Sequence, residues 1–183
     1  AAWTISGRVR NILAPVLSVR ASCPAADLSE LGLGAEGRGP VTVFAEGPAA
    51  APRLRIAADL EDFRRGSLSL RRVWGEVEAV PGGPVRVVRL TASTAGGQVS
   101  VAGTACAGKA GAGPPATADL DWTFTPSARA APPAAGTMRW RGKSGTFSAR
   151  TLDGTWTLEG RLDEAAAAWK VSAEGRARPS GRL

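Results

Sequence analysis

Strict alternation of apolar and polar side chains is the feature that most constrains this chain. In the segment ADLDWTFT, Leu120, Trp122 and Phe124 fall on one side of an extended strand, while Asp119 and Asp121 fall on the other. Successive side chains of a β-strand point to opposite faces, so this spacing predicts a strand with one apolar and one polar face. The same spacing recurs along most of the sequence, and it predicts an all-β fold built on a curved antiparallel sheet, either a taco-like open barrel or a sandwich.

Twelve segments have this strand pattern, and one short segment, 25–33, has the pattern of a helix with Asp27 as its N-cap. The chain contains 23 glycines and 13 prolines, which argue against long helices. The predicted strands are 3–9, 16–21, 41–46, 53–61, 67–80, 85–92, 97–103, 118–125, 137–142, 145–152, 154–162 and 166–177.

Breaks in the alternation predict bends in the sheet. In the fifth predicted strand the apolar positions shift after Leu70, so a β-bulge near Arg71 and Arg72 is needed to keep one face buried. A similar shift occurs at Val87 and Val88 in the next strand. Bulges of this kind favour a curved sheet over a flat one.

Turn residues separate the predicted strands. The runs PGGP at 81–84 and DG at 153–154 predict short hairpins between antiparallel neighbours. The segments 107–117 and 126–136 are rich in alanine, glycine and proline and are predicted to be loops. A chain of 183 residues fits one domain of ordinary size, so we predict a single β-rich domain over 1–183.

Residue chemistry argues against an enzyme. The chain has no histidine and no tyrosine, which removes the imidazole and phenol groups that most often transfer protons in catalysis. Asp119 and Asp121 share a strand face, as a metal site or an acid/base pair would require. No third acid accompanies them, so the solvated side of a sheet is the simpler interpretation. We predict no catalytic residue, no metal ligand and no cofactor.

The net charge of +7 raises the question of anionic partners. The basic residues are spread along the chain rather than clustered, which favours a solvated strand face. Contact with anionic lipid headgroups or with a protein partner is the second interpretation. Nucleic acid is the least favoured, since its binding requires a basic patch, and we predict no nucleic-acid partner.

The two cysteines, Cys23 and Cys106, lie far apart in the sequence and match neither a CxxC redox motif nor a zinc-site spacing. Two interpretations stay open. They pair in an oxidising compartment, or they are two separate buried thiols.

The apolar side of the predicted strands also has two interpretations. The six tryptophans and their apolar neighbours either fill the core of a sheet packed on itself or line a channel for acyl chains. The candidate residues for contact with lipid are Leu68, Leu70, Val99, Val101, Leu120, Trp122, Phe124, Trp156 and Leu158.

The order of short motifs adds a resemblance. The stretch ADLSELGL at 26–33 precedes GPVTV at 39–43, and the later segments GSLSL at 66–70 and GGQVSVAG at 96–103 carry apolar residues at alternate positions after glycine. This order resembles the TamB/AsmA-like group of bacterial envelope proteins, in which a d-L-x-x-L stretch precedes strands of that form.

The resemblance extends over 1–103 and more loosely over 137–178. It implies a curved β-structure in the periplasm, tethered to the inner membrane in the full-length protein. An apolar groove would pass phospholipids between membranes or assist outer-membrane protein assembly. The implied partners are phospholipid acyl chains and an outer-membrane barrel protein. The chain departs from this pattern in its short length, its lack of an anchor and its alanine- and proline-rich loops, so we expect it to be a segment of a longer protein or a compact relative.

The tryptophan- and glycine-punctuated strands of 137–162 are also similar to the type II secretion system protein N. That second resemblance implies a structural or docking component whose partner is another secretion-system protein.

Overall fold

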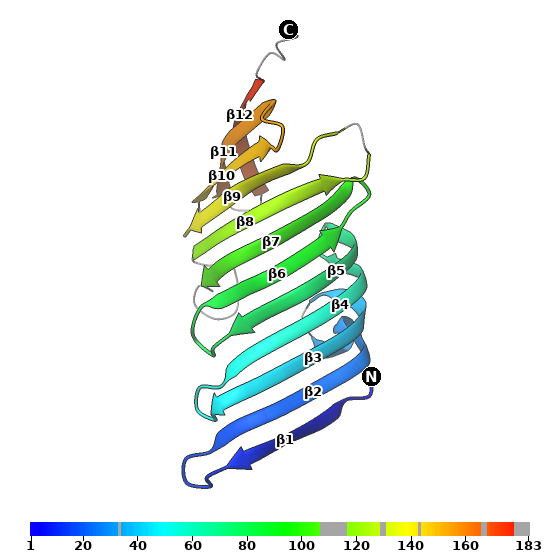
Figure 1. Cartoon of the computed structure of the whole chain (residues 1–183), viewed down its shortest axis with the longest axis vertical. Coiled ribbons are helices and arrows are strands. Elements are labelled where there is room, and N and C mark those ends of the chain that lie inside the picture. The colour runs from blue at the N-terminus through cyan, green and yellow to red at the C-terminus, as the bar shows by residue number, and fades with distance from the viewer. Residues whose placement is uncertain (33, 107–116, 129–130, 143, 166–167, 178–183) are drawn as a thin grey trace. The chain divides into compact units, whose positions relative to one another are not determined.

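The computed structural model of the chain is all-β (Figure 1). It describes residues 1–32, 34–106, 117–128, 131–142, 144–165 and 168–177. These residues form twelve strands and one short 3₁₀ helix. The chain divides into two compact units, Ala1–Ala95 and Gly96–Leu183, called unit 1 and unit 2 below.

Unit 1 is an antiparallel meander in which each strand pairs with the next one along the chain. Figure 1 shows one end of β3, β4 and β5 turning back behind the sheet, with the 3₁₀ helix η1 close to this bend. The elements are β1 (Thr4–Arg10), β2 (Val16–Asp27), η1 (Leu28–Leu31), β3 (Glu36–Pro48), β4 (Arg53–Arg65), β5 (Leu68–Ala79) and β6 (Val85–Ser93).

Unit 2 repeats the same antiparallel order of neighbours. Its strands are β7 (Gly97–Cys106), β8 (Thr117–Pro126), β9 (Ala134–Arg141), β10 (Ser144–Thr151), β11 (Trp156–Ala165) and β12 (Ala168–Ala177). Each strand predicted from the alternation therefore has a counterpart in the structure.

The predicted loop 126–136 is wrong at its end, because β9 already begins at Ala134. Ala134, Ala135 and Gly136 pair with Phe124, Thr123 and Trp122 of β8, and small residues there leave room for the two aromatic rings. Alternation of apolar and polar residues cannot identify a strand whose start consists only of alanine and glycine. Most of the other predicted loop, 107–117, lies outside the described residues, and Thr117 is the first residue of β8.

One of the two predicted irregularities is confirmed, and the other is wrong. The pairing of β5 with β6 moves from Glu76 opposite Arg89 to Val77 opposite Val87, which leaves Val88 as the extra residue of a bulge. The predicted bulge near Arg71 and Arg72 is not found, because the β4–β5 register is unchanged there, with Glu61 opposite Arg72 and Phe63 opposite Leu70. The irregularity lies on β4 instead, at Asp62, whose φ of 50° lies in the left-handed region. This break lets Phe63 pack beside the same buried cluster as Leu60, three positions earlier.

The two predicted hairpin turns are present. At the β5–β6 turn, the amide of Gly83 donates to the carbonyl oxygen of Val80 over 2.8 Å. At the β10–β11 turn, the amide of Gly154 donates to the carbonyl oxygen of Thr151 over 2.9 Å, and the φ of Gly154 is 71°. A positive φ at this position is readily adopted only by glycine.

The predicted helix is shorter than its sequence pattern, because residues 25–27 extend β2 and only Leu28–Leu31 turn. Asp27 caps this turn as predicted, and its carboxylate accepts a 3.0 Å hydrogen bond from the amide of Ser29. Arg38 donates to the same carboxylate over 2.9 Å. Hydrogen bonds from Ser29 and Arg38 lower the pKa of Asp27 to about 2. The capped turn places Leu28 over the sheet.

A small buried cluster gathers around this turn in unit 1. Val43, Ile56, Ala58 and Phe63 pack against it with partly exposed side chains. The buried members are Cys23, Ala26, Leu28, Ala35, Val41 and Leu60. Most other apolar side chains on this side of unit 1 are half-buried.

Candidate functional site

In unit 1 the strand register aligns apolar residues in rows that cross the whole meander. Directly paired residues of antiparallel strands lie on the same face of the sheet. One row consists of Ile5, Ala21, Val43, Ile56, Val77 and Val87. The next row consists of Gly7, Val19, Ala45, Leu54, Ala79 and Val85.

These two rows are accessible to a ligand. Ile5 is 71% exposed, and the other non-glycine side chains of both rows are half-buried. Among the described residues of unit 1, η1 is the only element besides the strands, and it lies over the buried cluster. The rows therefore form an apolar face without a second layer of helices or strands within the described part of unit 1. We call this surface the apolar face of unit 1.

The opposite face of unit 1 is charged. Arg55 donates two hydrogen bonds to the Glu76 carboxylate, one of them 2.9 Å long from Nη2 to Oε2. Arg72 donates in the same bidentate manner to Asp59, over 2.7 Å from Nε to Oδ1. These guanidinium groups lower the pKa of Glu76 and of Asp59. Since both acids stay ionised at neutral pH, this face favours water over lipid chains.

Two aromatic rings lie on the charged face, and each is covered by an arginine. The guanidinium carbon of Arg20 is 5.3 Å from the ring centre of Phe44. That of Arg72 is 5.4 Å from the ring centre of Trp74. Such cation–π contacts shield an aromatic side chain at a wet surface. Trp74 therefore belongs to neither of the two predicted settings, a sheet core or a lipid channel.

Unit 2 also has rows of apolar residues on one face. One row runs through Val101, Trp122, Gly136, Ala149, Leu158 and Gly175. A neighbouring row runs through Gly103, Leu120, Met138, Phe147 and Gly160. Val99 pairs with Phe124 on the other side of the first row. These rows form the apolar face of unit 2.

Aromatic rings of unit 2 cover glycines on neighbouring strands. A side-chain carbon at Gly136 would lie 2.8 Å from Cζ2 of Trp122, so the ring occupies the space above this glycine. Trp140 lies over Gly145 in the same way and is only 4% exposed. The Trp140 indole N–H donates to the carbonyl oxygen of Gly142 over 2.7 Å. Such pairs fix aromatic rings flat against the sheet.

The structure brings most of the predicted lipid-contact residues together. Val99, Val101, Leu120, Trp122, Phe124 and Leu158 share the apolar face of unit 2. Trp156 lies on the same side of β11 as Leu158, and the two are 56% and 38% exposed.

Leu68 and Leu70 are separate, since they lie in unit 1 at the β4–β5 end, opposite Arg65 and Phe63. Leu68 is 50% exposed and Leu70 is half-buried. The candidate set omitted the two rows of unit 1, although the alternation in 41–46 and 53–61 pointed to Val43 and Ile56.

Asp119 and Asp121 lie on the polar face of unit 2. Asp119 pairs with Arg139 across the sheet at 3.6 Å, and Asp121 is paired with Thr137 of β9. The described residues contain no group of three or more cysteine and acidic side chains that would hold a metal ion. This arrangement is that of a solvated sheet face with a surface ion pair.

The two cysteines are free thiols in the structure. Cys23 is 2% exposed and belongs to the buried cluster of unit 1. Cys106 is half-buried at the end of β7 in unit 2. The first interpretation, a Cys23–Cys106 disulfide, is therefore not what the structure has. The other interpretation, two separate thiols, describes this arrangement.

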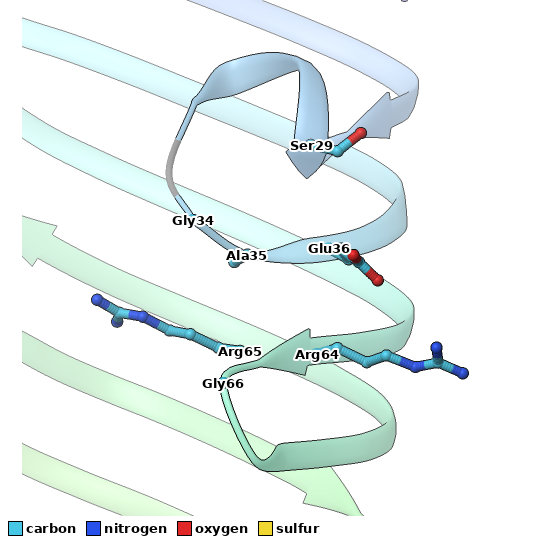
Figure 2. A pocket seen from close by; sticks show the side chains of 7 residues that line it. All are labelled: Ser29, Gly34, Ala35, Glu36, Arg64, Arg65 and Gly66. Carbon is cyan, nitrogen blue, oxygen red and sulfur yellow. The ribbon is translucent and has the colours of Figure 1, made fainter.

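A polar hollow that the sequence did not indicate lies at the bend of unit 1. Its volume is about 530 Å³, and Figure 2 shows Arg64 and Arg65 extending from β4 in opposite directions. Glu36 lines the same hollow. Because the two guanidinium groups diverge and a carboxylate lies nearby, they do not form a converging site for an anion.

Within the described residues, no helix is both long enough and apolar enough to cross a membrane. Comparisons of the chain with known protein families, curated proteins and solved structures found no match.

Proposed function

We propose that this chain is a non-catalytic part of a bacterial envelope protein and that its apolar sheet faces carry phospholipid acyl chains through the periplasm. The observation that carries the proposal is the sidedness of unit 1. Apolar residues cross it in rows on one face, while arginine–carboxylate pairs occupy the other. Its work would be the passage of phospholipids between membranes or help with outer-membrane protein assembly.

The physical basis is passive shielding of hydrocarbon from water. Transfer of each CH₂ group to an apolar surface is worth about 0.8 kcal/mol, so a chain of about fifteen carbons gains on the order of 10 kcal/mol before the costs of binding. Half-buried residues such as Ile56 and Val77 retain apolar surface that a lipid chain would cover. The headgroup would stay in water, so the mechanism needs no reaction.

The proposal is tested by measuring lipid on protein purified without detergent. Native mass spectrometry of the chain is expected to detect bound phospholipid. Leu158→Asp places a charge on the apolar face of unit 2 at a residue that is 38% exposed, so the fold should persist while the lipid load falls. Thr157→Asp is the matched control on the opposite side of the same strand. Wild-type protein without lipid, or equal loads in both variants, would contradict the proposal.

The second candidate function is docking within a secretion apparatus, and an exposed edge strand favours it. All residues of β1 are exposed, and within the described part of unit 1 β1 pairs only with β2. An unpaired strand edge can accept a strand from a partner protein. Co-purification of a partner protein without phospholipid would favour this alternative.

A further inference from the structure

The loop between β1 and β2 exposes two large apolar side chains almost completely. Ile12 is 95% exposed and Leu13 is 97% exposed. On either side of the loop, Val9 is 63% and Val16 is 44% exposed. A single exposed leucine is ordinary on a protein surface, but a contiguous apolar projection marks a contact with a protein or a membrane.

The backbone holds this loop in a defined shape. Asn11 has a φ of 59°, and its side-chain oxygen accepts hydrogen bonds from the amides of Leu13 and Ala14, over 3.3 and 3.4 Å. The amide of Ala49 donates to the carbonyl oxygen of Pro15 over 2.8 Å, which ties this loop to the β3–β4 loop. Ile12 and Leu13 are thus presented to solvent by a preformed turn.

Arginines outnumber acidic residues beside the loop: the cross-strand row next to it runs through Arg8, Ser18, Glu46 and Arg53. Arg8 and Arg10 line an open hollow of about 510 Å³ together with Ser18, which is paired with Arg8. The sequence contains no acidic residue before Asp27, whereas Arg8, Arg10 and Arg20 all precede it. Arginine binds phosphate groups through paired N–H donors.

We propose that the β1–β2 loop is a membrane-contact site for anionic phospholipid bilayers. Ile12 and Leu13 enter the boundary between headgroups and acyl chains, and Arg8 and Arg10 bind lipid phosphates at the surface. Apolar insertion combined with basic flanks is the arrangement that gives reversible binding to anionic membranes. This site goes beyond acyl-chain binding on the apolar faces and does not require it.

The test is flotation of the 183-residue chain with vesicles of phosphatidylcholine, with and without phosphatidylglycerol. Wild-type protein is expected to bind the anionic vesicles and to bind pure phosphatidylcholine much more weakly. The double variant Ile12→Ser/Leu13→Ser should weaken binding at least about tenfold, because two exposed side chains lose their insertion energy. The variant Arg8→Gln/Arg10→Gln should weaken binding to anionic vesicles about 25-fold, at about fivefold for each charge.

Leu152→Ser is the matched control, because Leu152 is 66% exposed at the β10–β11 turn of unit 2, and its binding should equal that of wild type. Circular dichroism checks that each variant folds. Unchanged binding of the Ile12→Ser/Leu13→Ser protein would overturn the proposal, as would equal wild-type binding to neutral and anionic vesicles. The proposal would also be overturned if sedimentation showed that the wild-type protein is a dimer and this variant a monomer, because the loop would then be a contact between two copies.

A second readout separates this site from the proposed function. Ile12→Ser/Leu13→Ser should lose vesicle binding and keep co-purified lipid. Leu158→Asp should lose co-purified lipid and keep vesicle binding. If only the vesicle-binding prediction fails, the acyl-chain proposal is unaffected. If only the co-purified-lipid prediction fails, the membrane-contact proposal is unaffected.

Discussion

Units 1 and 2 present the same one-sided pattern but stabilise it differently. In unit 1 the bend around η1 encloses a small buried cluster, and bidentate arginine–carboxylate pairs hold the charged face. In unit 2 aromatic rings lie over glycines of neighbouring strands, and Asp119 forms an ion pair with Arg139 at 3.6 Å. The comparison shows that alternation determines which face of the sheet is apolar. The buried cluster, the ion pairs and the aromatic–glycine contacts determine how each unit is stabilised.

The largest expected effect concerns the buried cluster of unit 1. Leu60→Ala removes a side chain that is 6% exposed, so we expect it to lower the free energy of unfolding by about 2–5 kcal/mol. Leu158→Ala, at a residue 38% exposed in unit 2, is the matched control and should cost less than about 1 kcal/mol. Urea denaturation followed by circular dichroism measures both. Equal losses would mean that unit 1 has no distinct core.

The next effect tests the aromatic–glycine pairs of unit 2. Gly136→Ala forces a methyl group against the Ser148 carbonyl and the Trp122 ring, and it should destabilise the protein by about 1–3 kcal/mol. Tryptophan fluorescence should shift as the ring moves. Gly175→Ala is the control, because a Cβ there meets its nearest atom, Cδ1 of Leu158, at 3.7 Å. If Gly136→Ala destabilised the protein no more than Gly175→Ala, the position of the Trp122 ring would not depend on Gly136.

A smaller effect concerns the charged face of unit 1. Arg55→Gln breaks the pair with Glu76, and since exposed ion pairs contribute little we expect the melting temperature to fall by no more than about 2 °C. High salt should reduce the difference from wild type. Arg139→Gln in unit 2 removes a longer pair and should change less. A large loss at Arg55 would show that this pair has a structural role beyond its surface contact.

The smallest effect is the acid response of the η1 cap. The pKa of Asp27 is about 2 in the folded chain, below its ordinary value of 3.8. A lowered folded pKa contributes stability above the unfolded value, and this contribution is lost as the pH falls through about 2. Asp27→Asn should therefore flatten the acid limb of the stability curve between about pH 4 and pH 2. Thermal unfolding across this range checks it, and identical limbs for wild type and variant would contradict the assignment.

The strands and turns could be predicted from the sequence because each depends on residues that are close together in the chain. Alternation located each strand, Pro81 and Gly154 marked hairpin turns, and the slip at Val87 marked a bulge. The start of β9 could not be predicted, since Ala134 and Gly136 carry no alternation and pair because they lie opposite large rings.

The candidate site was predictable only in part. The register set by the strands, not the pattern alone, gathers Val101, Trp122 and Leu158 into one row. Leu68 obeys the same alternation and yet lies apart at a strand end. The loop with Ile12 and Leu13 has no periodicity, so only its exposure in the folded chain distinguishes it from a buried turn.

A photo-crosslinking scan along β4 tests the sidedness of lipid contact most directly. A photoreactive residue is placed in turn at Leu54, Arg55, Ile56 and Ala57, and the protein is irradiated in cells. Crosslinks to phospholipid are expected at Leu54 and Ile56, which lie in the apolar rows, and not at Arg55 or Ala57, which lie on the charged face. Crosslinks at all four positions, or at none, would contradict the account.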